Sequence, residues 1–291
     1  MKLGIVGQKD NPRARSLVEA VRMDLRDDDV TIVVDDVTAR ALSEDRHDTY
    51  GGVAKPELEP PESIPAAEMD TCDLVVSIGG DGTFLHAARG AAGTPIIGVN
   101  LGEVGFLNAV SPGDAIAVIR DVVGDIREDG TTPTRALPRL QAGGEDWTIP
   151  PALNEVVVQG PQRGHGNGAG VTVRIDDALY TSGHADGVLI ATPTGSTAYN
   201  LSEGGPLVPP DVPVFVVTEM AAERPMPPLI VGEDTTITVR IENAETAAVV
   251  SDGRVTRDVE PPTQVEIERA EQPVHVAGPP LEFFTALRKL E

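Results

Sequence analysis

Cysteine is almost absent from this chain of 291 residues, in which Cys72 is the only one. A lone cysteine excludes an internal disulfide, and we therefore expect an intracellular protein. The five histidines are scattered, and no His-x-x-x-His or paired-cysteine spacing supports a zinc site. We assign no metal ligand directly from the sequence.

Lysine and aromatic residues are also scarce. The 46 acidic residues outnumber the 23 lysines and arginines, the net charge is −23, and aromatic residues make up 3% of the chain. This balance argues against nucleic acid as a partner, since phosphate binding needs a basic face. The acids are spread along a chain that keeps its apolar periodicity, which argues against an acidic tail or a disordered protein. They predict a halophilic protein of a salt-rich cytoplasm, where ions screen the self-repulsion.

Long apolar runs are missing as well. No stretch approaches the ~18 apolar residues of a membrane helix, so we expect no membrane partner. The opening residues MKLGIVGQ lack the long apolar segment and cleavage site of a secretory signal. They predict a first strand.

The chain length and the apolar content of 40% predict two domains, each with its own core. Apolar runs alternate with segments of helical spacing, which predicts a parallel, Rossmann-like α/β domain over residues 1–128. Residues 43–70 are rich in acids and proline and predict a solvated loop. The expected strands cover residues 2–7, 30–36, 73–80 and 94–100, and the expected helices cover residues 12–25, 83–92 and 111–124.

The pattern changes after this domain. Short runs of Val, Ile and Thr, from NEVVVQG to PVHVAG, are separated by Gly, Pro and Asp. They predict an all-β domain over residues 129–275. Residues 276–291 end in PLEFFTALRKLE, which predicts a C-terminal helix that packs back on the first domain.

The stretch LVVSIGGDGTFLHAAR, from Leu74 to Arg89, places a single acid, Asp81, in a glycine turn between a strand and a helix. Backbone N–H groups of such a turn can hold an anion, and ligands of open α/β sheets bind at the carboxyl ends of strands. An acid there would repel a phosphate unless it organises a metal ion or takes a proton from an attacking hydroxyl. The combination predicts phosphoryl transfer. The alternative is an ordinary turn with a helix-capping Asp.

Other phosphate-binding motifs are missing from the sequence. A Walker-type loop needs a Gly-Lys pair, which the chain does not contain. A dinucleotide fingerprint needs three spaced glycines, whereas the first strand offers only Gly4 and Gly7.

Two further stretches carry groups suited to a nucleoside. The run from His184 to Pro210, HADGVLIATPTGSTAYNLSEGGPLVPP, combines hydroxyls, close-approach glycines and one ring, Tyr199, which can hold a ribose and stack a base. The run LNEVVV places Asn154 and Glu155 side by side at a strand start, where they can bind a vicinal diol. Read separately, the two stretches also fit a turn-rich loop and a surface pair.

In this order, the motifs resemble those of the NAD kinase family. The resemblance spans residues 74 to about 254, and TPTGSTAY is its most specific run. GGDGT also occurs in diacylglycerol kinase-like and phosphofructokinase-like enzymes. The resemblance implies an NAD kinase-like two-domain fold, in which the all-β domain binds substrate. The matching stretches are GGDGTFLHAAR, GVNLGEVGFL, LNEVVV, ADGVLIATPTGSTAYNLSEGGP, ERPMPP and DGR (Asp252–Arg254).

The resemblance also implies a role for each matching residue. Asp81 matches the catalytic acid proposed to take the proton of the adenosine ribose 2′-hydroxyl. His86 and His184 stand where relatives often carry a more basic residue, and a neutral His gives a weaker phosphate contact than Arg. The residues implied to bind the phosphates of ATP are Gly79, Gly80 and Thr83. The residues implied to bind NAD are Gly82, His86, Asn154, Glu155, His184, Asp186, Thr194, Thr197, Ala198, Tyr199 and Ser202.

The implied reaction is phosphorylation of the 2′-hydroxyl of the adenosine ribose of NAD, giving NADP. The implied donor is ATP, with polyphosphate as an alternative, and Mg²⁺ is expected to arrive with ATP. The family also implies a homodimer or homotetramer in the cytoplasm. Two other functions stay open at this point. One is a lipid or sugar kinase, which would share GGDGT. The other is a non-catalytic NAD(H)-binding sensor, which would not need Asp81.

Overall fold

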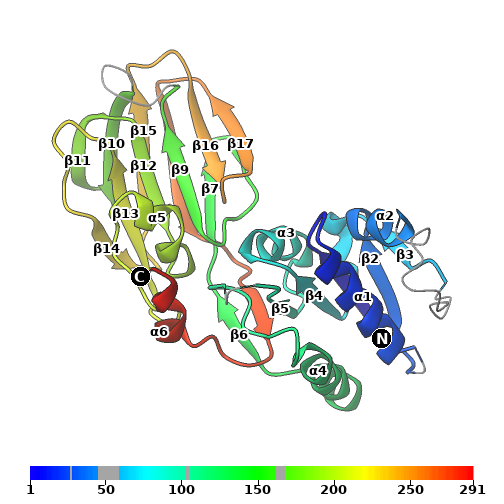
Figure 1. Cartoon of the computed structure of the whole chain (residues 1–291). Helices are drawn as coiled ribbons and strands as arrows, with labels where there is room; N and C mark the ends of the chain where they lie inside the picture. Colours follow the sequence, from blue (N-terminus) through cyan, green and yellow to red (C-terminus); the bar gives the residue numbers. More distant parts are fainter. Residues whose placement is uncertain (27, 45–58, 103–104, 162–167, 291) are drawn as a thin grey trace. The chain divides into compact units, whose positions relative to one another are not determined.

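The computed structural model divides into two compact units (Figure 1). Unit 1 comprises residues 1–136 and 274–291, and unit 2 comprises residues 137–273. The division falls after residue 136, beyond the expected boundary at 128, because strand β6 pairs within the sheet of unit 1. The structure describes residues 1–26, 28–44, 59–102, 105–161 and 168–290.

Unit 1 is built on one seven-stranded sheet in the order β3-β2-β1-β4-β5-β19-β6. The neighbouring strands from β3 to β19 run parallel. The strands are β1 (Lys2–Gly7), β2 (Thr31–Asp35), β3 (Glu62–Ile64), β4 (Leu74–Ile78), β5 (Ile96–Val99), β6 (Thr134–Leu137) and β19 (Val274–Ala277). The helices are α1 (Pro12–Asp24), α2 (Asp36–Glu44), α3 (Asp81–Ala91), α4 (Ala115–Asp129) and α6 (Phe283–Ala286), with 3₁₀ turns at Ala66–Thr71 and Leu287–Leu290.

The centre of this sheet explains where a ligand can bind. β4 is buried along its whole length, as expected of a central parallel strand. The chain leaves β1 toward β2 on one side and leaves β4 toward β5 on the other, so the strand order reverses between β1 and β4. Ligands of open α/β sheets bind beyond the carboxyl ends of the strands at such a reversal.

Three local expectations for unit 1 are corrected by the structure. PVHVAG forms β19, which pairs in parallel with β5 in unit 1 and is not a strand of the β-rich unit. Within the expected loop 43–70, residues 43–44 end α2, Glu62–Ile64 form β3, and a 3₁₀ turn begins at Ala66 and buries Met69. Residues 45–58 lie outside the described residues. Helix α4 begins later than residue 111, because Ser111 and Asp114 bond to each other in a turn before it (2.7 Å).

The end of the chain belongs to unit 1. Its helical part is one short helix, α6, followed by a 3₁₀ turn. Phe283 packs against Phe106, with 6.2 Å between the ring centroids. In the described part of the chain, no helix has both the length and the apolar character needed to span a membrane.

Unit 2 contains two six-stranded sheets, ordered β11-β10-β15-β18-β7-β8 and β14-β13-β12-β9-β16-β17. Apolar side chains from both sheets share one buried core, as expected for strands that alternate inward and outward residues. The strands of the first sheet are β7 (Leu140–Gly144), β8 (Trp147–Thr148), β10 (Ala169–Ile175), β11 (Ala178–Ala185), β15 (Ile237–Glu242) and β18 (Thr263–Arg269). The second sheet has β9 (Glu155–Gln159), β12 (Gly187–Ala191), β13 (Val214–Met220), β14 (Leu229–Gly232), β16 (Ala247–Ser251) and β17 (Val255–Val259), with a 3₁₀ turn at Thr194–Thr197 and the short helix α5 (Tyr199–Ser202).

Candidate active site

The GGDGT motif forms the turn from β4 into α3. Gly80 occupies the N-cap position and Asp81 is the first helical residue, so the acid is not the cap. A Cβ atom on Gly79 would stand 2.5 Å from Thr83 Oγ1 and 2.8 Å from Gln8 Cβ, which explains why glycine is needed there. Gly80 is exposed, and apart from its chain neighbours and the backbone of its own helix, none of the described residues has an atom within 4 Å of its Cβ position. The turn is therefore open on the side where an anion could approach its backbone.

The carboxylate of Asp81 is held by a loop that follows β5. Oδ2 accepts the N–H of Phe106 (3.0 Å), while Oδ1 accepts the N–H of Leu107 (3.2 Å) and Nδ2 of Asn108 (3.1 Å). Gly105 lets this loop approach, since a Cβ atom there would stand 2.1 Å from Asp81 Oδ1. A carboxylate offers about four acceptor directions. These three bonds therefore fix the orientation of the acid and, among the described residues, leave Oδ2 with one further acceptor direction.

Asn108 is a site residue that the sequence analysis missed. Its side chain is fully buried, and Gly98 of β5 makes room for it, because a Cβ atom on Gly98 would stand 2.7 Å from Asn108 Oδ1. Asn108 follows directly after GVNLGEVGFL, whose spaced glycines were the available signal. Within that stretch, residues 103–104 lie outside the described part of the structure.

The remaining predicted residues of unit 1 lie on α3. Gly82 is exposed and Thr83 is half-buried, and both belong to the same turn as Asp81. His86 lies further along the helix and is exposed. The structure thus gathers Gly79 to Thr83 in one turn and places His86 outside it.

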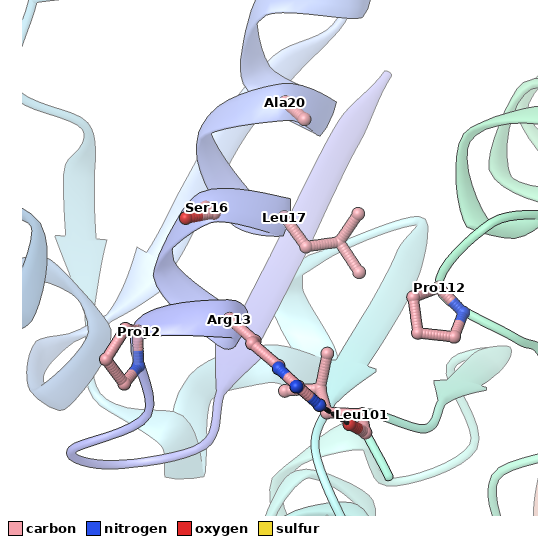
Figure 2. Close-up of a pocket in the computed structure, with 7 residues that line it drawn as sticks. All are labelled: Pro12, Arg13, Ser16, Leu17, Ala20, Leu101 and Pro112. Atoms are coloured by element: carbon pink, nitrogen blue, oxygen red, sulfur yellow. Dashed lines mark hydrogen bonds between the residues drawn. The ribbon is translucent and has the colours of Figure 1, made fainter.

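Unit 1 also has an apolar groove of about 580 Å³ beside the first turns of α1. In Figure 2 the guanidinium of Arg13 points to Leu101, and its Nη1 donates to the Leu101 carbonyl (3.4 Å). The sequence analysis singled out none of these residues, and the lining offers few polar groups, so we assign no substrate to the groove. Its lining residues are Pro12, Arg13, Ser16, Leu17, Ala20, Leu101 and Pro112.

In unit 2, the predicted pair Asn154 and Glu155 stands at the start of β9. The carboxylate of Asp252, between β16 and β17, accepts the backbone N–H groups of Leu153 (3.1 Å), Asn154 (2.7 Å) and Glu155 (3.4 Å). The N–H of Asp252 in turn donates to the Glu155 carbonyl (3.0 Å). The sequence assigns no role to the acid of the DGR stretch. In the structure this acid holds residues 153–155, here called the NE turn.

The TPTGST run meets the same turn. Thr192 donates its hydroxyl to the Leu153 carbonyl (2.6 Å) and its N–H to the Asn154 carbonyl (2.9 Å). A Cβ atom on Gly195 would stand 2.0 Å from the Asn154 carbonyl oxygen. Three motifs that are far apart in the sequence therefore converge on Asn154 and Glu155.

Glu155 has an altered acidity. Its side chain is 6% exposed, and Oε2 has no hydrogen-bond partner among the described residues. Burial, followed by the negative charge of Asp252, raises the pKa of Glu155 to about 7, against the lowering effect of the Tyr199 backbone N–H. The group can therefore change its charge near neutral pH.

The segment after Thr192 is fixed by buried polar contacts. Asn200 is fully buried, accepts the Thr218 hydroxyl (2.9 Å) and donates to the carbonyls of Ser196 (3.3 Å) and Pro206 (3.1 Å). The Thr194 side chain is buried, and its Oγ1 has no partner within the described residues. Of the other predicted residues in this segment, Thr197, Ala198 and Tyr199 are half-buried and Ser202 is exposed.

His184 and Asp186 lie apart from this cluster. They flank the junction of β11 and β12, and Asp186 is buried while His184 is half-buried. In the pairing of β12 with β9, Gly187 stands opposite Gln159 and Ala191 opposite Glu155. Four residues of extended chain span roughly 13 Å. The structure therefore places these two residues at the other end of β9 from the NE turn.

An acid in an open glycine turn at the strand-order reversal, together with a polar, hydroxyl-rich cluster on a β-rich unit, defines a nucleotide-handling phosphotransferase. The chain matches the model of the ATP-NAD kinase N-terminal domain over residues 3–126 and that of the ATP-NAD kinase C-terminal domain over residues 153–278. It is 57% identical to the NAD kinase of Haloarcula marismortui over 290 residues, covering 100% of both chains. The chain belongs to the NAD kinase family.

Other relatives agree with this assignment. The NAD kinase of Halobacterium salinarum is 51% identical over 300 residues, again covering 100% of both chains. An NAD kinase from Archaeoglobus fulgidus, solved in complex with ATP, superposes with a TM-score of 0.75 at 25% identity and 100% coverage of both chains. Yeast NADH kinase complexed with NADH shares the fold, with a TM-score of 0.83 at 23% identity, covering 100% of this chain and 87% of that one. The activity is accordingly that of an NAD kinase, which excludes the lipid or sugar kinase and the non-catalytic sensor.

Proposed function

We propose that the chain transfers the γ-phosphoryl group of ATP to the 2′-hydroxyl of the adenosine ribose of NAD, and that Asp81 accepts the proton of that hydroxyl. The observation that carries this proposal is the fixed carboxylate of Asp81 in the open glycine turn. Among the described residues, Oδ2 accepts one hydrogen bond, from Phe106, and keeps one direction for a substrate hydroxyl.

Phosphoryl transfer forms one bond to the γ-phosphorus and breaks another. The ribose oxygen forms a bond to the γ-phosphorus, the bond between that phosphorus and the β,γ-bridging oxygen breaks, and ADP leaves. The hydroxyl proton moves to Asp81. Little covalent chemistry is left to the protein, so positioning and charge neutralisation carry most of the rate.

ATP is the proposed donor because the matching family models are those of ATP-NAD kinases and the Archaeoglobus fulgidus relative was solved with ATP. We propose that the Gly79–Thr83 turn holds its phosphates through the N–H of Gly80 and the hydroxyl of Thr83. The N–H groups of Gly79 and Thr83 already donate to the carbonyls of Val99 (2.8 Å) and Gly80 (2.9 Å). Gly80 leaves that side of the turn open, and the start of α3 favours negative charge. Polyphosphate stays the alternative donor.

Mg²⁺ is the proposed cofactor, carried by the donor. No group of three or more His, Cys, Asp or Glu among the described residues could hold a metal ion. Mg²⁺ commonly keeps several waters and binds largely through substrate phosphates, so it need not occupy the acceptor direction of Asp81 that is proposed for the ribose hydroxyl. When bound, the ion would offset negative charge on the phosphates.

Unit 2 supplies the proposed groups for NAD. Asn154 offers an amide. Glu155 offers an oxygen and Thr194 a hydroxyl that have no partner in the described part of the chain, and both of these side chains are buried. Buried polar atoms without partners are rare in folded proteins, and a bound polar molecule is one of the explanations for them. We propose that these groups bind ribose hydroxyls and the base of NAD beside the predicted residues Thr197, Ala198, Tyr199 and Ser202. His184 and Asp186 would engage a more distant part of the dinucleotide.

The test is an NAD analogue that contains 2′-deoxyadenosine. We expect the analogue to bind in calorimetry and to yield no phosphorylated product by ³¹P NMR with Mg-ATP, while NAD yields NADP. Product formed from the analogue would show that another hydroxyl of NAD is the phosphoryl acceptor. Replacing ATP by polyphosphate in the reaction with NAD shows which of the two is the phosphoryl donor.

A homodimer or homotetramer in the cytoplasm is also proposed, on the family resemblance alone. Light scattering at molar KCl measures the mass in solution. A monomeric mass at assay concentrations would contradict the oligomer.

A further inference from the structure

The carboxylate of Asp252 holds three consecutive backbone N–H groups, those of Leu153, Asn154 and Glu155. Leu153 and Asn154 precede β9 and Glu155 is its first residue, and the last two form the pair proposed to bind NAD. Asp252 is only 8% exposed, so its hydrogen bonds compete little with water. Asp252 thus holds the N–H groups of the NE turn, while Thr192 holds two of its carbonyls.

The backbone at Asp252 is built for this task. Its φ of +47° lies in the left-handed region, and Gly253 follows at φ +62°. Aspartate tolerates this conformation better than most residues, at some cost in strain. The turn points the carboxylate back toward β9, where the N–H of Asp252 also donates to the Glu155 carbonyl (3.0 Å).

The charge of Asp252 has identifiable neighbours. Arg139, which is buried and donates Nε to the Gln272 carbonyl (2.8 Å), feels its attraction, since Asp252 counteracts the burial that lowers the pKa of Arg139. Glu155 feels its repulsion, and the backbone N–H of Tyr199 favours the ionised form of Glu155. Asp252 therefore acts on Glu155 through both the backbone and its charge.

We propose that Asp252 is a positioning residue for NAD: it fixes the Leu153–Glu155 backbone so that the side chains of Asn154 and Glu155 are already placed to meet the dinucleotide. This inference rests on the proposed role of Asn154 and Glu155 in NAD binding. It assigns Asp252 no contact with either substrate.

The test replaces Asp252 by Asn and by Ala and measures steady-state kinetics with NAD and ATP varied separately. Asparagine keeps one acceptor oxygen and alanine keeps none. We expect the KM for NAD to rise about tenfold for Asp252→Asn and further, toward a hundredfold, for Asp252→Ala. The KM for ATP and kcat at saturating NAD should change much less, because the lost placement can be restored by bound NAD.

Asp176→Asn is the matched control. Asp176 also has a positive φ, of +46°, lies in a hairpin of unit 2 and accepts one backbone N–H, that of Thr236 (3.0 Å). We expect its KM for NAD to equal that of the wild type. Hydrogen exchange should show faster exchange at residues 153–155 only in the Asp252 variants and at residue 236 only in the Asp176 variant.

A KM for NAD within twofold of the wild type in Asp252→Asn would overturn the proposal, and so would an equal rise in Asp176→Asn. If Asp252→Ala does not fold, the KM for NAD of Asp252→Asn and its hydrogen exchange at residues 153–155 still test the proposal. Asn154→Ala distinguishes a failure of the positioning role of Asp252 from a failure of the proposed NAD site. Normal NAD binding in Asn154→Ala would defeat the proposed NAD site, whereas weakened binding there with a normal Asp252→Asn would defeat only the positioning role.

Discussion

Gly195 lies against Asn154 so closely that a Cβ atom on the glycine would stand 2.0 Å from the Asn154 carbonyl oxygen and 2.5 Å from the carbonyl carbon. The obstacle is backbone, which cannot rotate away as a side chain can. Glycine at this position therefore allows the TPTGST segment to touch the NE turn.

Gly195→Ala should separate the two motifs. Overpacking against buried backbone costs about 1–3 kcal/mol, so we expect a lower melting temperature and a raised KM for NAD. The control is Gly232→Ala in β14, where the nearest atom to the Cβ position is Thr235 Oγ1 at 3.8 Å. Equal melting temperatures and equal KM values for the two variants would contradict the packing argument.

Glu155 should make stability depend on pH near neutrality. Its pKa is raised from 4.5 to about 7 in the folded chain, so the folded state binds the proton more tightly than the unfolded state. The free energy of unfolding should therefore fall as pH rises from about 4.5 to about 7, by up to about 3 kcal/mol. Glu155→Gln should remove this slope, and the measurement is denaturant unfolding at a series of pH values.

The control for this experiment is Glu219→Gln in the same unit. Glu219 accepts the Thr181 hydroxyl (2.9 Å) and the Met226 N–H (2.7 Å) and should leave the slope in place. A wild-type profile that is flat between pH 4.5 and 7.5, or a slope that survives in Glu155→Gln, would speak against the raised pKa.

The sequence predicted the parts of the fold that depend on local pattern. Apolar runs followed by helical spacing located β1, α1, β4 and α3, and GGDGT marked the turn that carries Asp81. The pairing of β19 with β5 could not be predicted. It brings Val276 opposite Ile96, two residues far apart in the chain, and the local sequence of neither segment indicates its partner. PVHVAG reads equally well as a strand of either unit.

The same limit applies to the site. Residue types identified Asn154, Glu155 and Asp81, since the chemistry of a side chain follows directly from its residue type. The hydrogen bonds that hold them come from backbone N–H groups, which every residue except proline carries, and from partners such as Asp252 that are distant in the chain. Buried contacts of this kind become visible only when the fold is known.

The charge of −23 should make the folded chain depend on salt. Its highly identical relatives come from Haloarcula marismortui and Halobacterium salinarum, which agrees with a salt-adapted surface. We expect the melting temperature to rise from dilute buffer to molar KCl, because screening weakens the repulsion among acids. Sorbitol at matched osmolality is the control, and an equal rise in sorbitol, or no rise in KCl, would argue against screening.

Asp81→Asn tests the chemistry proposed for the glycine turn. The amide oxygen can still accept the bonds from Leu107 and Asn108, so the turn and its loop should keep most of their geometry. The substitution removes the group that takes the proton. General-base removal typically costs ~10²–10⁴-fold, and kcat should fall by roughly that factor while NAD affinity, measured by calorimetry, stays near the wild-type value.

Asp114→Asn supplies the comparison within unit 1. Asp114 precedes α4 and accepts the Ser111 hydroxyl (2.7 Å), so this change removes a carboxylate at a helix start without touching the glycine turn. We expect its kcat to match the wild type. A near-normal kcat for Asp81→Asn at saturating Mg-ATP and NAD would mean that the carboxylate only anchors residues 106–108. The proton would then leave the ribose hydroxyl without a protein base, because the loosely bonded transition state of phosphoryl transfer places little demand on the attacking oxygen.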